Sequence, residues 1–274
     1  MIRPSRRPGL CCALLALAIA ALFVFPAFAG AGKETVEADV STRSVAITSS
    51  FTGTEILIFG TVENSNQPSA EAGTYDIVVV VEGTPAPQIV RKKSNLFGLW
   101  INTHSMRFAS FPSYYAIAST RPIDEIADKA ALNKLEIGFD HVRMVPAGAG
   151  TRYGPDDPKE VAEYRASVIR LKQRERLYLT ADYGVTFIGR SLFRSTISLP
   201  PNVPVGPLTT RVFLFREGQM LSQYKNQVTL VRAGVERFLY DSAYHRPLLY
   251  GMATVLVAAA AGLAAAFGVK RLGF

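Results

Sequence analysis

The sequence predicts a mainly β protein, in which one or more antiparallel immunoglobulin-like sandwiches carry a helical insertion and precede a C-terminal transmembrane α-helix. Three observations support this fold class. Short apolar and β-branched runs alternate with turn residues on both sides of the chain's middle. A single amphipathic helical pattern separates these two regions. An uncharged apolar segment of 22 residues lies near the C-terminus, at residues 248–269.

Residues 1–29 have the order of a secretory signal peptide. Three arginines precede a 16-residue apolar segment at residues 10–25, and a proline and an Ala-Phe-Ala triplet follow it. Sixteen helical residues cover about 24 Å, which is too short for a hydrocarbon core of about 30 Å. We therefore predict cleavage after Ala29, and an uncleaved signal anchor is the alternative.

Residues 30–121 form the predicted N-terminal β-rich region. Its expected strands are Val45–Thr48, Ile56–Val62, Tyr75–Val81, Ile89–Val90, Leu99–Ile101, Met106–Phe108 and Tyr114–Ala118. Turn residues such as Gly83-Thr84-Pro85 separate them. Tyr75–Val81 is almost continuously apolar, which is typical of a central strand buried on both faces.

Residues 122–180 form the predicted helical insertion. A short helix is expected to begin at Pro122, and residues 146–155 are expected to form a loop. A second helix begins with an N-cap, a first-turn proline and a capping glutamate, which are Asp157, Pro158 and Glu160. Its apolar residues at helical spacing are Val161, Tyr164, Val168 and Leu171. This stripe is expected to pack against the sheet, and docking of a partner is the alternative.

Residues 181–234 form the predicted C-terminal β-rich region. The expected strands are Val185–Ile188, Leu192–Leu199, Leu208–Phe215 and Tyr224–Val231. With their Pro- and Gly-rich connections they resemble the closing strands of an immunoglobulin-like domain, a likeness that implies no function. Residues 235–247 suit a juxtamembrane helix.

Residues 248–269 are long enough to cross a bilayer, because 22 helical residues cover about 33 Å. A buried helix of a soluble core is the alternative. Lys270 and Arg271 begin a short tail, residues 270–274, and basic residues favour the cytoplasmic side of a membrane. The expected topology is a large domain outside the cytoplasm and a cytoplasmic C-terminus.

Charge argues against a nucleic-acid partner, and cysteine content argues against a cysteine-based site. The whole chain has a formal net charge of +8, but six basic residues lie in the leader, at the membrane edge or in the tail: Arg3, Arg6, Arg7, Arg246, Lys270 and Arg271. Residues 30–245 therefore hold 24 basic and 22 acidic residues, a net charge of +2, so we expect no nucleic-acid partner. Both cysteines, Cys11 and Cys12, lie in the leader, which excludes a disulfide or thiolate site from the mature chain.

No catalytic, cofactor-binding or metal-binding residues are predicted. The three histidines are His104, His141 and His245, and none has the spacing of a zinc site. No Gly-x-Ser-x-Gly nucleophile motif is present. Acidic pairs such as Asp124-Glu125 lie at expected helix starts, where capping and the helix dipole account for them. We therefore expect neither an enzyme nor a cofactor.

One cluster of cationic and aromatic residues predicts ligand or partner binding. Its members are Arg91, Lys93, Trp100, Asn102, Tyr114, Tyr115 and Arg121, with Lys92 and His104 beside them. If opposed strands bring them to one face, cationic donors beside aromatic walls suit a small anion or a partner's acidic loop. The alternative is an edge strand protected by lysines, with Trp100 and the tyrosines in the core.

Several segments are shared with a known family. They are Arg91-Lys92-Lys93, Gly98-Leu99-Trp100-Ile101-Asn102, Pro112-Ser113-Tyr114-Tyr115-Ala116, Ser119-Thr120-Arg121-Pro122, Leu192-Phe193-Arg194, Leu199-Pro200, Pro204-Val205-Gly206, Leu214-Phe215-Arg216-Glu217-Gly218 and Leu249-Tyr250-Gly251. Over nearly the whole mature chain the sequence resembles an uncharacterised alphaproteobacterial "putative transmembrane protein" family. Pro207-Leu208-Thr209 departs from the tyrosine-led strand typical of the family, which leaves the start of that strand open.

The resemblance implies a periplasmic domain held in the inner membrane of a Gram-negative bacterium, whose relatives are often encoded beside sulfite-exporter-type permeases. We therefore predict a non-enzymatic, membrane-anchored module that binds or supports an envelope partner, with such a permease as the candidate. A periplasmic receptor for a small anion is the alternative, and an enzyme of another type is the third. Gly262 and Ala266 in the span permit close helix contact, so self-association stays open.

Overall fold

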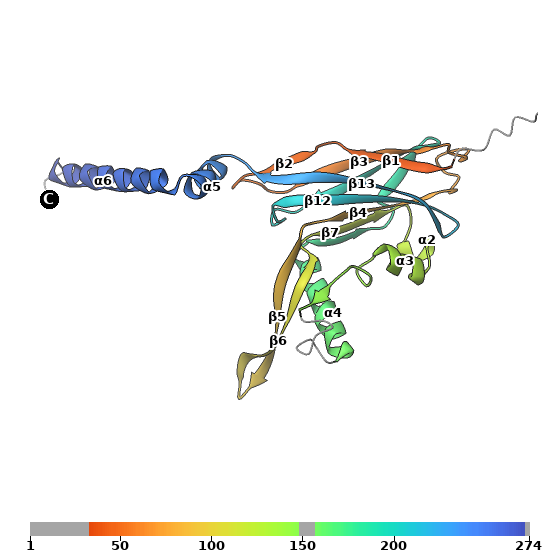
Figure 1. Cartoon of the computed structure of the whole chain (residues 1–274), viewed down its shortest axis with the longest axis horizontal. Coiled ribbons are helices and arrows are strands. Elements are labelled where there is room, and N and C mark those ends of the chain that lie inside the picture. The colour runs from red at the N-terminus through yellow and green to blue at the C-terminus, as the bar shows by residue number, and fades with distance from the viewer. Residues whose placement is uncertain (1–32, 148–156, 272–274) are drawn as a thin grey trace, which may run out of the picture. The chain divides into compact units, whose positions relative to one another are not determined.

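The computed structural model describes residues 33–147 and 157–271. The predicted signal peptide and most of the loop expected at residues 146–155 lie outside these ranges. The described chain is mainly β, with three sheets, a few helices between strands, and two helices at the C-terminal end (Figure 1). The prediction of a mainly β protein with a C-terminal apolar helix is therefore confirmed.

The first sheet has four strands in the order β1-β3-β11-β10, all antiparallel. They are β1 (Thr35–Val40), β3 (Thr54–Glu63), β11 (Leu192–Leu199) and β10 (Val185–Ile188). Buried and exposed residues alternate along β3 and β11, because one face of the sheet covers the core and the other faces water. Both strands lie close to their predicted bounds, whereas β1 was not predicted.

The second sheet has six strands in the order β2-β13-β12-β4-β7-β9. They are β2 (Ser44–Ile47), β13 (Gln219–Arg232), β12 (Gly206–Arg216), β4 (Asp76–Glu82), β7 (Tyr115–Ser119) and β9 (Tyr178–Ala181). The two edge strands, β2 and β9, pair in parallel and the others in antiparallel fashion. Residues 77–81 of β4 are at most 1% exposed, which confirms the prediction of a central strand buried on both faces. β12 begins at Gly206, so Pro207 lies inside the strand.

Strands from the two predicted β-rich regions are interleaved. β3 pairs with β11 in the first sheet, and β4 pairs with β12 in the second. The two sheets lie against each other, with β1 beside β12 and β13, and their facing side chains share one hydrophobic core (Figure 1). Residues 33–121 and 181–234 therefore contribute to a common core.

A third sheet has the order β5-β6-β8 and consists of a long hairpin with a two-residue strand at its base. Its strands are β5 (Pro85–Leu96), β6 (Leu99–Pro112) and β8 (Val145–Pro146). Three short strands were predicted in place of the two long hairpin strands. The hairpin side chains Val90, Met106 and Phe108 join the core, whereas residues nearer the turn are exposed. The hairpin therefore projects beyond the packed part of the protein (Figure 1).

The predicted helical insertion contains α2 (Ile123–Ile126), α3 (Lys129–Leu135) and α4 (Pro158–Arg174). Asp157 caps α4 by accepting a hydrogen bond from the backbone N–H of Lys159 at 2.8 Å. On the predicted stripe, Tyr164 and Val168 are buried in the core, but Leu171 is 49% exposed. The helix therefore packs through part of its stripe, and its C-terminal end leaves apolar surface open.

The chain ends in α5 (Val235–His245) and α6 (Pro247–Arg271). Within the described residues, α6 is the helix long and apolar enough to cross a bilayer, with a mean hydropathy of 2.0 over Pro247–Ala265 and none of that segment buried. A helix with such a composition, none of it buried in the protein, is stable in lipid, where its backbone groups are paired internally. Both predicted helices at this end are thus present.

Candidate functional site

The end of the β5–β6 hairpin is a tight turn with an uncommon residue at its first position. Phe97 and Gly98 both have positive φ angles, 51° and 85°, and they connect the paired residues Leu96 and Leu99. This is the geometry of a tight two-residue hairpin turn, in which glycine suits the second position. Asn95 stabilises the turn by accepting a hydrogen bond from the N–H of Gly98 at 2.9 Å. Phe97 instead holds a backbone conformation that few non-glycine residues adopt.

Large apolar side chains are exposed around this turn. We define the hairpin tip as Leu96, Phe97, Leu99, Trp100 and Ile101. Phe97 is 100% exposed, and Leu99 and Trp100 are 69% and 68% exposed. Single exposed apolar residues are common, but a contiguous group on a projecting element marks an interaction site. The strained backbone of Phe97, which carries a fully exposed aromatic ring, also indicates an interaction site.

The hairpin is also strongly basic. Between Glu82 and Asp124 the chain contains no acidic residue, whereas the hairpin strands contain Arg91, Lys92, Lys93 and Arg107. Residues 85–112 therefore carry four positive and no negative formal charges. The tip combines apolar contact surface with a cationic stem, a combination that complements apolar surface bordered by negative charge.

Four of the seven predicted binding residues lie on this hairpin. Arg91 and Lys93 are exposed on β5, Trp100 and Asn102 are exposed on β6, and Lys93 pairs with Asn102 in the register. β5 forms the edge of its sheet, so basic residues there also protect it from pairing with other strands.

The two predicted tyrosines lie elsewhere. Tyr114 and Tyr115 are both fully buried, and their hydroxyls donate hydrogen bonds to the carbonyl oxygens of Ser198 and Glu136 at 2.8 and 2.9 Å. Burial raises the pKa of both phenols, which therefore remain neutral. The tyrosines thus contribute to the core, as the alternative interpretation held, and are not part of the hairpin surface.

Arg121, the seventh predicted residue, forms an ion pair with Asp76 of β4 and does not lie on the hairpin. Its Nε and Nη2 atoms donate to the two carboxylate oxygens of Asp76 at 2.9 and 2.8 Å. The hydroxyl of Thr120 also donates to Asp76, at 3.0 Å. A bidentate pair of this kind fixes the guanidinium. The expected single face of seven residues is therefore not formed, and the binding role of the hairpin residues stays a prediction.

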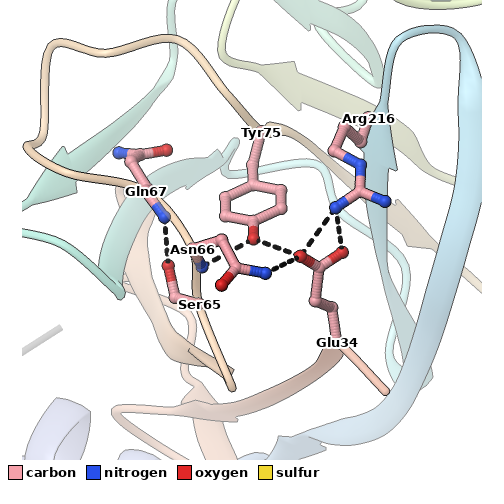
Figure 2. Close-up of polar contacts among 6 residues, drawn as sticks. All are labelled: Glu34, Ser65, Asn66, Gln67, Tyr75 and Arg216. Atoms are coloured by element: carbon pink, nitrogen blue, oxygen red, sulfur yellow. Dashed lines mark hydrogen bonds and ion pairs between the residues drawn. The ribbon is translucent and has the colours of Figure 1, made fainter. Parts of the chain in front are cut away.

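A buried polar network surrounds Glu34, just before β1 (Figure 2). The Glu34 carboxylate accepts hydrogen bonds from the Tyr75 hydroxyl and the Asn66 side-chain amide, both at 2.7 Å. Arg216 Nη1 donates to both carboxylate oxygens, at 2.7 and 2.6 Å. Because its oxygens are occupied by four close donor contacts, this carboxylate is better suited to joining strands than to accepting a substrate proton.

A hollow of about 680 Å³ lies at one edge of the two sheets. Its lining includes the apolar residues Ala116, Ile117 and Leu179, and the charged residues in it are Glu55 and Arg176. Among residues 33–147 and 157–271, no group of three or more His, Cys, Asp and Glu side chains could hold a metal ion. In the described part of the chain, the hairpin tip is therefore the surface that best fits a binding role.

Sequence reasoning missed Leu96, Phe97, Leu99 and Ile101 as site residues. Their signal was present in the chain, as an apolar run around a Phe-Gly turn inside a long segment without acidic residues. Alternating strand patterns locate buried residues, but a hairpin that leaves the core exposes both of its faces near the turn.

Comparison with known families supports a membrane protein. The model of a family described as "Putative transmembrane protein (Alph_Pro_TM)" matches residues 35–271 of this chain. The match includes the β strands, the hairpin and the apolar helix α6. No curated protein matches the chain.

Proposed function

Because the chain belongs to this family of putative transmembrane proteins, we propose that it is a non-enzymatic, membrane-anchored module that binds or supports another envelope component. In this proposal α6 crosses the bacterial inner membrane, the β body stands in the periplasm, and the C-terminus is cytoplasmic. The partner is an integral-membrane protein, and a permease of the sulfite-exporter type is the candidate that the family resemblance suggests.

Three sequence features support this location. The leader pattern of residues 1–29 predicts export, and α6 is long enough to stop transfer in the bilayer. Lys270 and Arg271 follow the apolar part of α6, and basic residues at this position favour the cytoplasmic side.

Cysteine labelling tests the topology, because the chain has no cysteine after Cys12. We expect Tyr183→Cys, at a site that is 66% exposed on the body, to react with a membrane-impermeant maleimide in intact spheroplasts. Phe274→Cys should react only after the membrane is permeabilised. The parent chain measures any labelling of the leader cysteines. Labelling of Phe274→Cys but not Tyr183→Cys in sealed spheroplasts would reverse the proposed orientation.

The exposed hairpin tip is the observation that carries the binding role. Phe97, Leu99 and Trp100 are each more than two thirds exposed, and exposing such groups in an isolated protein is unfavourable. An integral-membrane partner offers apolar surface beside the bilayer that holds α6. Its periplasmic loops can supply the acidic groups that complement Arg91 and Lys93.

Anchoring increases the strength of such an interaction. Fourteen residues, 233–246, separate the end of β13 from α6, and even fully extended they span less than about 50 Å. The hairpin is therefore confined near the membrane, where its effective concentration toward a membrane partner is high.

A photo-crosslinking phenylalanine analogue at position 97 tests this role in native membranes. We expect irradiation to give an adduct with an integral-membrane protein, and Leu99→Ser with Trp100→Ser should reduce its yield by about tenfold. The same analogue at Tyr183, which is exposed on the body, is the matched control and should give little adduct. Adducts with lipid alone, or none at position 97, would contradict docking on a protein.

A further inference from the structure

A second surface lies between the hairpin stem and α4. A groove of about 520 Å³ is lined by Val90, Arg91 and Lys92 of β5 and by Glu163, Tyr164, Ser167, Arg170, Leu171 and Arg174 of α4. Arg170 and Arg174 are one helical turn apart, so they lie on the same face of the helix. The groove therefore faces cationic side chains from two separate elements.

Most of the positive charge in this groove is not neutralised by the protein. Lys92 Nζ pairs with Glu163 Oε1 at 2.8 Å. Within the described part of the chain, no salt bridge is formed by Arg91, Arg170 or Arg174, the three other cations of the groove. Like charges one turn apart on a helix repel each other, so a bound anion would relieve a repulsion that the protein leaves in place.

Tyr164 supplies an independent indication of a ligand. Its side chain lines the groove and is 4% exposed, yet its hydroxyl has no hydrogen-bond partner among the described residues. A buried hydroxyl without a partner destabilises a protein, and such groups are rare. Burial and the nearby Glu160 raise the pKa of this phenol, so the hydroxyl keeps its proton. The Tyr164 hydroxyl can therefore donate a hydrogen bond to a ligand.

The chemistry of the lining selects the class of ligand. Guanidinium groups are donors only, and their planar forks match the oxygen atoms of phosphates and similar oxyanions. Tyr164 and Ser167, which also line the groove, carry hydroxyl groups that can donate hydrogen bonds without adding charge. The one carboxylate in the lining, that of Glu163, is already paired with Lys92.

We propose that the groove between β5 and α4 binds an oxyanion of the phosphate type through Arg91, Arg170, Arg174 and Tyr164. The ligand is a free anion or the headgroup of an anionic phospholipid, which share this chemistry. This site is distinct from the hairpin tip, and variants of one surface leave the residues of the other unchanged.

The test has two arms, both with the full-length chain. In the first, the chain in detergent micelles is titrated calorimetrically with inorganic phosphate. In the second, binding of phospholipid is compared between nanodiscs of anionic and of zwitterionic lipid. We expect binding in at least one arm, and Arg170→Ala with Arg174→Ala should weaken it by about tenfold or more. The matched control removes two exposed lysines of α3, Lys129→Ala with Lys134→Ala, which changes the net charge equally and should leave binding within about twofold. Heat with phosphate identifies a free anion, and a response to anionic lipid alone identifies a headgroup.

The variant Tyr164→Phe distinguishes a ligand-binding role of Tyr164 from a role in packing alone. Removing a hydroxyl that lacks a partner should leave the melting temperature unchanged or raise it, while affinity for the anion falls several-fold. A role confined to packing would not change the affinity. The proposal is overturned if neither arm shows binding, or if the arginine variant and the lysine control bind equally well. The crosslinking result at position 97 does not depend on either outcome.

Discussion

Replacing Gly60 with alanine is expected to destabilise the two packed β sheets strongly. Gly60 lies in the middle of β3, where it pairs with Ala38 of β1 and Phe193 of β11. A Cβ atom at this position would overlap the carbonyl oxygen of Glu37 and lie 2.6 Å from the ring of Phe193. The first of these contacts is with backbone, which cannot move without separating β1 from β3. The close approach of β1 therefore requires glycine here.

We expect Gly60→Ala to lower the free energy of unfolding by more than about 3 kcal/mol, because overpacking against backbone costs more than most core substitutions. In a protein of this size the melting temperature should fall by about 10 °C or more. Circular dichroism of the detergent-solubilised chain measures this change. Thr61→Ala, an exposed neighbour on the same strand, should have an effect within about 0.5 kcal/mol. Equal melting temperatures for the two variants would show that β1 does not pack on β3 as described.

The sequence was informative where local chemistry is decisive. β10 and β11 have their predicted bounds, because each combines alternating apolar residues with clear turn signals. The start of α4 was predicted from Asp157 and Pro158, since an N-cap and a first-turn proline act within a few residues. The apolar length of α6 likewise needs no tertiary information.

Elements that depend on distant partners were missed. β1 alternates Val36, Ala38 and Val40 with acidic residues, a half-buried strand pattern that was passed over because the segment is short and follows the leader; its partner β3 lies further along the chain. β9 is a four-residue edge strand that pairs in parallel with β7, across the whole helical insertion. Neither pairing has a signature in the nearby sequence, because it is determined by which strands the core brings together.

The expected single face of seven residues does not form, for a related reason. The sequence suggested that Tyr114 and Tyr115 would join the basic residues of the preceding strand. The chain turns into the main sheet after Pro112, however, so both tyrosines enter the core while Arg91 and Trp100 stay on the projecting hairpin. How far a hairpin extends from the body depends on which strands it packs against, and composition alone does not determine this.

Removing the Glu34 carboxylate is expected to destabilise the protein in a way that depends on pH. Glu34→Ala leaves the Tyr75 hydroxyl and the Arg216 guanidinium without their acceptor, in a site where Tyr75 is 1% exposed. The Arg216 side chain is 40% exposed, so water screens the charge left behind, and the lost acceptor of Tyr75 dominates; the loss should be about 1 to 2 kcal/mol near neutral pH. Glu63→Ala, at an exposed hydrogen bond with Thr35 on the neighbouring strand, is the matched control and should cost about 0.5 kcal/mol.

The pH dependence separates this network from simple loss of packing. Burial alone would raise the pKa of Glu34, but hydrogen bonds from Tyr75 and Asn66 and the charge of Arg216 outweigh it, so the pKa lies below its ordinary value of 4.5. The carboxylate therefore stabilises the fold fully above pH 4.5, and this contribution is lost as the pH falls through the lower pKa of the folded state. The difference in melting temperature between the parent chain and Glu34→Ala should stay constant from about pH 6 to pH 8 and shrink below about pH 4. A difference that persists unchanged in acid would mean that the side chain acts by filling space. In that case the ion pair with Arg216 would not be what attaches the start of β1 to β12.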